Sequence, residues 1–204
     1  MIVLSALSTL TGTVFTIEKK LAAFGDTYQI SDASGNLLAT VKKDGLSFTF
    51  ETSNGAKIGE IFGSQPNNTL PDYREIYDFH ILDDKGAVLA KVKLKAFPHQ
   101  RTDFLRNAAW NFDYSWSVEG PAGEELAKIK RPGDITDASV AIDSIESASG
   151  EVVAKFERKA LSLRQNCRVE ILDPRISPYL VLAALFAHPP SRPATKGGHQ
   201  MYVI

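Results

Sequence analysis

One segment of this sequence combines the side chains that a small-molecule site needs. It runs over Phe97–Tyr114 and reads FPHQRTDFLRNAAWNFDY. Long loops often carry function, and aromatic walls with a few polar groups suit a small aromatic or apolar ligand, for example a chromophore. The alternative is that Phe104, Leu105 and Trp110 only plug one end of the fold. The candidate ligand-binding residues are His99, Arg101, Phe104, Arg106, Asn107, Trp110, Asn111 and Tyr114.

Basic side chains form a second candidate site, between residues 128 and 168. Lysine and arginine gathered on one outer face would attract the phosphate groups of an anionic membrane surface. Glu151 and Glu157 lie in this stretch and Glu170 lies just after it, and these acidic residues favour the alternative of a solvated strand face with balanced charge. The candidate lipid-binding residues are Lys128, Lys130, Arg131, Lys155, Arg158, Lys159, Arg164 and Arg168.

No catalytic or metal-binding motif stands out in the chain. The four histidines are far apart and lack the spacing of metal ligands: they are His80, His99, His188 and His199. Cys167, the only cysteine, opens an expected strand, where packing as a small apolar side chain is favoured over a nucleophilic role. Asp83 and Asp84 precede a glycine, as turn residues do. We therefore expect no enzymatic activity, no metal and no certain cofactor beyond a possible bound organic ligand.

Composition limits the class of protein. The chain has 204 residues, 44% of them hydrophobic, which suffices for one all-β domain with a single core. A formal net charge of −1 provides no positive field for nucleic acid. A single cysteine allows no intrachain disulfide and favours the cytoplasm. The apolar N-terminus lacks the basic residues that begin a secretory signal, and Tyr179–Ala187 is too short to span a membrane.

One pattern recurs five times, around Gly35, Gly55, Gly86, Gly123 and Gly150. An apolar residue stands five positions before each glycine, a tiny one four positions after it, and another apolar one six after it. Alternation of this kind predicts strands with one wet and one buried face, and the turn residues before each glycine suit a positive φ. Each copy is therefore a predicted hairpin. The third residue after each glycine is aliphatic, and it lies either on an outer stripe or at a bulge.

Ten strands from the hairpins and two flanking ones, Gly12–Ile17 and Cys167–Leu172, make a total of twelve. Closure into an antiparallel β-barrel would remove the exposed edges. A helix is expected over about residues 177–188, with Ser177 as its cap and Pro178 at its first position. It is apolar all round, so we expect it inside the barrel, where the tiny residues leave room for it. Packing outside an open sheet is the alternative. We expect one domain over residues 1–188 and a tail over 189–204.

The repeat, the closing strand CRVEILDP and the apolar segment YLVLAALFA together resemble the LURP-one-related proteins, over about residues 12–188. These belong with the phospholipid scramblases and the tubby C-terminal domain. The resemblance implies a twelve-stranded barrel around a central hydrophobic helix. Members of the group bind membranes, act in signalling or have no assigned activity, so the resemblance specifies the fold more closely than the function.

Calcium-driven scrambling is not expected, because the acidic loop of scramblases is matched here only by Glu170 and Asp173, with Arg168 and Arg175 beside them. Their palmitoylated cysteine cluster has no counterpart. Phosphoinositide binding, as in tubby domains, would use the basic residues named above. The first hypothesis is thus a non-enzymatic barrel that binds a small aromatic or apolar ligand at its mouth. A peripheral module for anionic lipid is the alternative, and a scaffold without ligand is a third.

Overall fold

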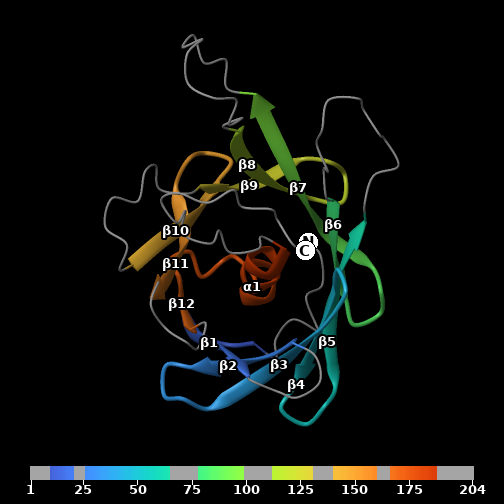
Figure 1. The fold of residues 1–204 in the computed structure, drawn as a ribbon, viewed down its shortest axis with the longest axis vertical. Helices are drawn as coiled ribbons and strands as arrows, with labels where there is room; N and C mark the ends of the chain where they lie inside the picture. Colours follow the sequence, from blue (N-terminus) through green and yellow to red (C-terminus); the bar gives the residue numbers. More distant parts are fainter. Residues whose placement is uncertain are drawn as a thin grey trace, which may run out of the picture.

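The computed structural model describes residues 10–20, 26–64, 78–98, 112–130, 140–159 and 166–187. They form twelve strands and one helix, arranged as a closed barrel (Figure 1). The strands are β1 Val14–Lys20, β2 Asp26–Asp32, β3 Leu37–Asp44, β4 Ser47–Thr52, β5 Lys57–Ser64, β6 Asp78–Asp83, β7 Val88–Pro98, β8 Phe112–Glu119, β9 Glu125–Lys130, β10 Val140–Ser147, β11 Val152–Lys159 and β12 Asn166–Ile171.

Each strand pairs antiparallel with its neighbours in the sequence, and β1 closes the barrel against β12. In the closing pair Phe15 lies opposite Val169, and Ile17 lies opposite Cys167. All four side chains are buried. The predicted all-β, closed twelve-stranded antiparallel barrel is therefore confirmed, including both flanking strands.

All five predicted hairpins have the same turn. The five glycines have φ between 84° and 87°, a left-handed conformation that side chains disfavour. In the first hairpin the Gly35 amide donates to the Asp32 carbonyl over 3.0 Å, and the Asp32 amide donates to the Asn36 carbonyl, also over 3.0 Å. The other four hairpins repeat this pair of bonds, the geometry of a type I turn followed by a left-handed residue.

The third residue after each glycine lies at a β-bulge, which decides between the two alternatives for it. In the first hairpin Ser31 pairs with Leu37 and Ile30 pairs with Ala39, so the register passes over Leu38. The same shift occurs in each of the other hairpins. A bulge adds one unpaired residue and increases the twist of the strand. The five bulged residues are Leu38, Ile58, Leu89, Leu126 and Val153.

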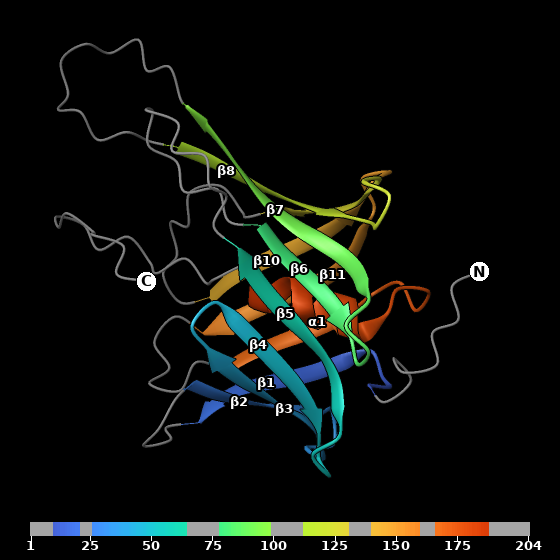
Figure 2. The ribbon, with the colours of Figure 1, turned by 90° about the vertical axis from the view of Figure 1, so that its right-hand side faces the viewer.

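The helix α1, Pro178–Ala187, lies inside the barrel (Figures 1 and 2). Tyr179 is fully buried, and its hydroxyl donates to the Leu82 carbonyl over 2.7 Å. A Cβ atom placed on Gly59, the tiny residue of the second repeat, would overlap the Tyr179 ring. The tiny position therefore makes room for the helix, as predicted. Among the described residues, the Ser177 hydroxyl, expected to cap α1, has no hydrogen-bond partner. The Ser177 carbonyl accepts from the Val181 amide over 3.2 Å.

Candidate functional site

The two ends of the barrel differ in their connections. The five glycine turns and the start of α1 lie at one end, which we call the turn end. At the other end, which we call the mouth, the odd-numbered strands finish, the even-numbered strands begin and α1 ends. All of the segments that the structure leaves undescribed between strands connect strands at the mouth.

Aromatic side chains line the interior next to the mouth. The position seven residues before each repeat glycine faces inward, because it alternates with the buried residue five before the glycine. Four of its five residues are aromatic, and Asp143, which replaces the aromatic in the fifth hairpin, is also buried. The sequence analysis missed this layer, although the spacing to the glycines was a signal for it. The five residues are Tyr28, Phe48, Phe79, Trp116 and Asp143.

Three of the rings at this end surround Phe186, near the carboxyl end of α1. The centroid of Phe186 lies 5.1 Å from that of Tyr28 at an interplanar angle of 77°, and 5.4 Å from that of Phe50 at 90°. The distance to Phe48 is 5.6 Å. The pairs with Tyr28 and Phe50 have the edge-to-face arrangement that aromatic pairs prefer, whereas the pair with Phe48 is tilted at 51°. Tyr28 and Phe186 remain only partly buried, so this aromatic cluster, Tyr28, Phe48, Phe50 and Phe186, keeps some apolar surface accessible.

Two lysines lie against the rings of the aromatic cluster. Lys19 Nζ is 5.9 Å from the centroid of Tyr28 and 2.7 Å from Oδ1 of Asp26. Lys43 Nζ is 5.8 Å from the centroid of Phe48, within the range of a cation–π contact. The hydrogen bond to Asp26 raises the pKa of Lys19, and burial raises the pKa of Tyr28. Both lysines thus place an ammonium group next to an aromatic ring of the cluster.

The predicted ligand-binding residues lie mostly outside the described residues. Seven of them belong to the undescribed connection from β7 to β8: His99, Arg101, Phe104, Arg106, Asn107, Trp110 and Asn111. Tyr114 lies in β8, where it pairs with Ala96 of β7. Since β7 ends and β8 begins at the mouth, both attachment points of this segment are at the same end of the barrel as the aromatic cluster.

Of the predicted lipid-binding residues, the described ones lie on β9, β11 and β12. Lys128, Lys155 and Arg168 are exposed, but each has an acidic neighbour: Lys128 lies 3.1 Å from Glu125, while Lys155 pairs in register with Glu170 and Arg168 with Glu157. Arg158 pairs with Cys167, a buried residue, and so occupies a different register position from Lys155. Lys130 and Lys159 lie in β9 and β11. Arg131 and Arg164 lie outside the described residues.

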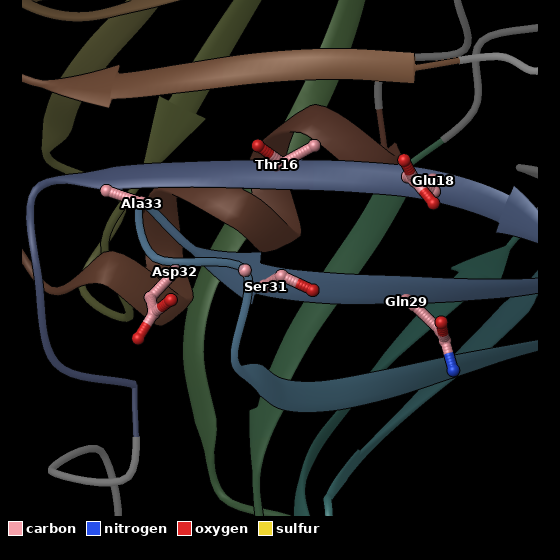
Figure 3. Close-up of a pocket in the computed structure, with 7 residues that line it drawn as sticks. Thr16, Glu18, Gln29, Ser31, Asp32 and Ala33 are labelled. Atoms are coloured by element: carbon pink, nitrogen blue, oxygen red, sulfur yellow. The ribbon is translucent and has the colours of Figure 1, made fainter.

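Two shallow hollows mark the outer surface. The first, of about 320 Å³, lies over β1 and β2 and is polar (Figure 3). Its carboxylates already accept hydrogen bonds, Glu18 from Asn166 and Asp32 from the amides of Ser34 and Asn36. The bonds from Asn36 lower the pKa of Asp32. The hollow is lined by Thr16, Glu18, Gln29, Ser31, Asp32, Ala33 and Gly35.

The second hollow, of about 360 Å³, lies at the turn end beside the start of α1 and is largely apolar. Ile171, Pro174 and Ile176 contribute to its wall. Next to it, Arg175 donates to both carboxylate oxygens of Asp173, over 2.9 Å from Nε to Oδ1 and 2.7 Å from Nη2 to Oδ2. These bonds lower the pKa of Asp173 to about 2. The Asp173 carboxylate, a few residues before α1 in the sequence, is thus already paired with Arg175.

Neither a metal centre nor a membrane-spanning helix is found in the part of the chain that the structure describes. Within it, no three His, Cys, Asp or Glu side chains lie close enough together to hold a metal ion. Cys167 is buried in the barrel wall, opposite Ile17. None of the described helical residues forms a segment long and apolar enough to cross a bilayer.

Comparison with known proteins gives one extensive match and two limited ones. The model of the LURP-one-related family matches residues 13–188. A DNA-directed RNA polymerase subunit beta of Geotalea daltonii is 35% identical over 88 residues, a match that covers 43% of this chain but only 6% of the polymerase subunit. An X-ray structure of a protein from Arabidopsis thaliana is 13% identical, with a TM-score of 0.49, over 88% of this chain and 92% of that one.

Proposed function

Since this chain belongs to the LURP-one-related family, we propose that it is a non-catalytic binding module whose barrel takes up a small aromatic or apolar molecule at its mouth. Family membership accounts for the barrel but does not name a ligand. The proposal is carried by one observation, the aromatic cluster around Phe186 that remains only partly buried at the mouth.

The aromatic cluster is suited to a flat apolar ligand. Tyr28 and Phe186 present partly exposed ring surface, and covering such surface contributes roughly 25 cal/mol per Å² of apolar area removed from water. A ring of the ligand could add a further edge-to-face contact, worth about 1 kcal/mol. Because α1 fills the barrel interior below Phe186, the ligand would sit on the end of the helix rather than inside the barrel.

The segment between β7 and β8 supplies the other half of the proposed site. Its attachment points, Pro98 and Phe112, lie opposite each other at the mouth. The residues proposed to contact the ligand from this segment are those predicted from the sequence, from His99 to Tyr114, and they stay a prediction. Together with the aromatic cluster they would enclose a ligand from two sides.

The proposal is tested by native mass spectrometry and absorbance of protein purified from its source. We expect a mass adduct, or near-ultraviolet or visible absorbance beyond that of the tryptophans and tyrosines. A recombinant sample, stripped under denaturing conditions and refolded, should then bind the neutral fluorescent probe N-phenyl-1-naphthylamine. A protein-only mass and spectrum, together with no binding of the probe, would contradict the proposal.

A peripheral module for anionic lipid is the second candidate, supported by the exposure of Lys128, Lys155 and Arg168. Their acidic neighbours leave little net positive charge on this part of the outer surface. Salt-dependent flotation with anionic liposomes would favour this candidate over binding of a small molecule at the mouth. A scaffold that binds neither probe nor liposomes is the third.

A further inference from the structure

We infer that the mouth selects an anion, so that its ligand is an aromatic or apolar acid whose negative group binds at Lys19 and Lys43. This inference rests on the proposed function, since it concerns the same site, and it adds the charge of the ligand. It is carried by the position of these two lysines, on the inward face of the barrel wall and against the aromatic cluster.

The strand register places both lysines on the inward face. Lys19 follows Phe15 and Ile17 in the alternation of β1, and both of those residues are buried. Lys43 follows Ala39 and Val41 in β3, which are also buried. Lys19 pairs with Tyr28, and Lys43 pairs with Phe48. At the last inward position of two strands, the barrel therefore has a cation beside the apolar interior that these strands line.

Their sequence neighbours have a different environment. Lys20 and Lys42 are exposed, whereas Lys19 and Lys43 are partly buried. Lys42 forms an ion pair with Glu51 over 2.7 Å on the outer surface. Lys43 instead extends toward the ring of Phe48. A long side chain that packs its methylene groups on apolar surface keeps its ammonium group available at the rim.

On the inward face of β1, β2 and β3 next to the mouth, the described charged side chains are two lysines and one carboxylate. Asp26 is the carboxylate that pairs with Lys19, and it also pairs in register with Lys43 on the neighbouring strand. Lys19 contacts this carboxylate, whereas the Lys43 ammonium lies against the Phe48 ring. Tyr28 adds no negative charge at neutral pH, and burial raises its pKa further above the ordinary value of 10.0. A ligand anion would restore the balance, in surroundings where partial burial strengthens the attraction.

The lysines also lie near the carboxyl end of α1, where cations stabilise the helix dipole by roughly 0.3–1 kcal/mol. That structural role predicts lower stability for a charge-removing variant and no effect on which probe binds. The ligand role predicts a change in charge preference. The thermal unfolding midpoint of every variant is therefore measured beside its binding constants.

Two fluorescent probes that share one ring system distinguish the structural role of the lysines from the ligand-binding role. 8-Anilinonaphthalene-1-sulfonate carries a negative charge, and N-phenyl-1-naphthylamine does not. We expect the full chain to bind the sulfonate more tightly than the neutral probe, and high salt to reduce the difference. Lys43→Gln should weaken the sulfonate about fivefold, as loss of a partly exposed charge pair does, and leave the neutral probe within about twofold. Lys42→Gln, the outward-facing control, should change neither.

The outcomes distinguish this inference from the proposed function. If the neutral probe binds and the sulfonate binds no better, or if Lys43→Gln weakens both equally, the inference is wrong and the proposed function stands. If neither probe binds, both are wrong. Should Lys43→Gln lower the thermal midpoint so far that binding cannot be measured, Lys43→Arg and Lys19→Gln replace it. Retention of the sulfonate preference by Lys43→Arg and its loss in Lys19→Gln would support the inference, and the reverse would overturn it.

Discussion

The turn end and the mouth are built from the same five hairpins, yet the five copies are more alike at the turn end than at the mouth. At the turn end the backbone hydrogen bonds are the same in every copy, although the residue that begins the turn changes from Asp32 to Thr52 to Gly120. At the mouth the backbone pairing continues, but the inward side chains change from Tyr28 through Trp116 to Asp143. Repetition thus maintains the fold at one end, and variation at the other end leaves a surface with its own chemistry.

The helix connects the two ends, and its contacts differ between them. Near the turn end the Tyr179 hydroxyl is held by backbone carbonyls of β5 and β6. Near the mouth the Phe186 ring packs against the rings of Tyr28, Phe48 and Phe50. Hydrogen bonds fix one end of α1 in a single position, whereas ring contacts tolerate adjustment. We therefore expect substitutions near the turn end to reduce stability, and substitutions at the mouth to change binding.

The largest effect is expected from Gly59→Ala. The new Cβ would overlap the Tyr179 ring and approach the Leu82 carbonyl, and overpacking of this kind costs about 1–3 kcal/mol. Gly55→Ala is the matched control, because nothing lies within 4 Å of its Cβ and only its φ of +85° opposes the substitution. Chemical unfolding should show a larger loss of stability for Gly59→Ala. A larger loss for Gly55→Ala would mean that turn geometry, and not room for the helix, limits the fold.

Tyr179→Phe tests the hydrogen bonds at the same end and should cost about 1–2 kcal/mol, because the Leu82 and Glu60 carbonyls lose their donor. Burial raises the pKa of Tyr179 above its ordinary value of 10.0. The hydroxyl therefore ionises more easily in the unfolded chain, so its contribution is complete below pH 10 and is lost as pH rises toward the folded-state pKa. The free energy of unfolding should fall above pH 10 in the native protein.

The control for this pH dependence is Tyr28→Phe, because burial raises the pKa of Tyr28 as well. If stability at high pH depends mainly on the helix contact, Tyr179→Phe should flatten the decline more than Tyr28→Phe does. Equal flattening by the two variants would assign the effect to both ends of the barrel alike. Urea unfolding measured at intervals from pH 8 to pH 11 gives the comparison.

The sequence was enough for the barrel, the hairpins and the buried helix, because all three follow from patterns that local physics imposes. It could not decide where the aliphatic residue three positions after each glycine lies. A β-bulge breaks the alternation from which the inward and outward faces of a strand are predicted. Nor could the sequence predict that Lys19 and Lys43 face inward. Each is one of two consecutive lysines, which is a pattern typical of a solvated surface, and only the strand register shows which of the two faces inward. The position seven residues before each glycine, which is aromatic in four of the five copies, could have been predicted from its spacing. The sequence analysis chose segment 97–114 instead, because that segment combines more aromatic and polar side chains.

At the mouth, Phe186→Leu should weaken binding of N-phenyl-1-naphthylamine about fivefold and lower stability by about 1 kcal/mol, because ring contacts with Tyr28 and Phe50 are lost while most of the apolar volume is kept. Phe62→Leu is the control on the outer surface, where the Phe62 side chain is 50% exposed. It should leave binding unchanged. If both variants weakened binding of the probe equally, the probe would not bind at the aromatic cluster. The proposed functional difference between the two ends would then be wrong.

The smallest effect is expected on the outer face. Flotation with vesicles that contain anionic lipid should be weak, because Glu170 and Glu157 lie beside Lys155 and Arg168 in the register and Glu125 pairs with Lys128. A surface cation with an acidic neighbour has little charge to offer a membrane, and the remainder is screened at physiological ionic strength. Lys155→Glu should therefore change flotation less than twofold, as should the turn-end control Lys85→Glu. Strong flotation that salt and Lys155→Glu both abolish would instead assign the function to the barrel wall, and the aromatic cluster would then serve only to pack the end of α1.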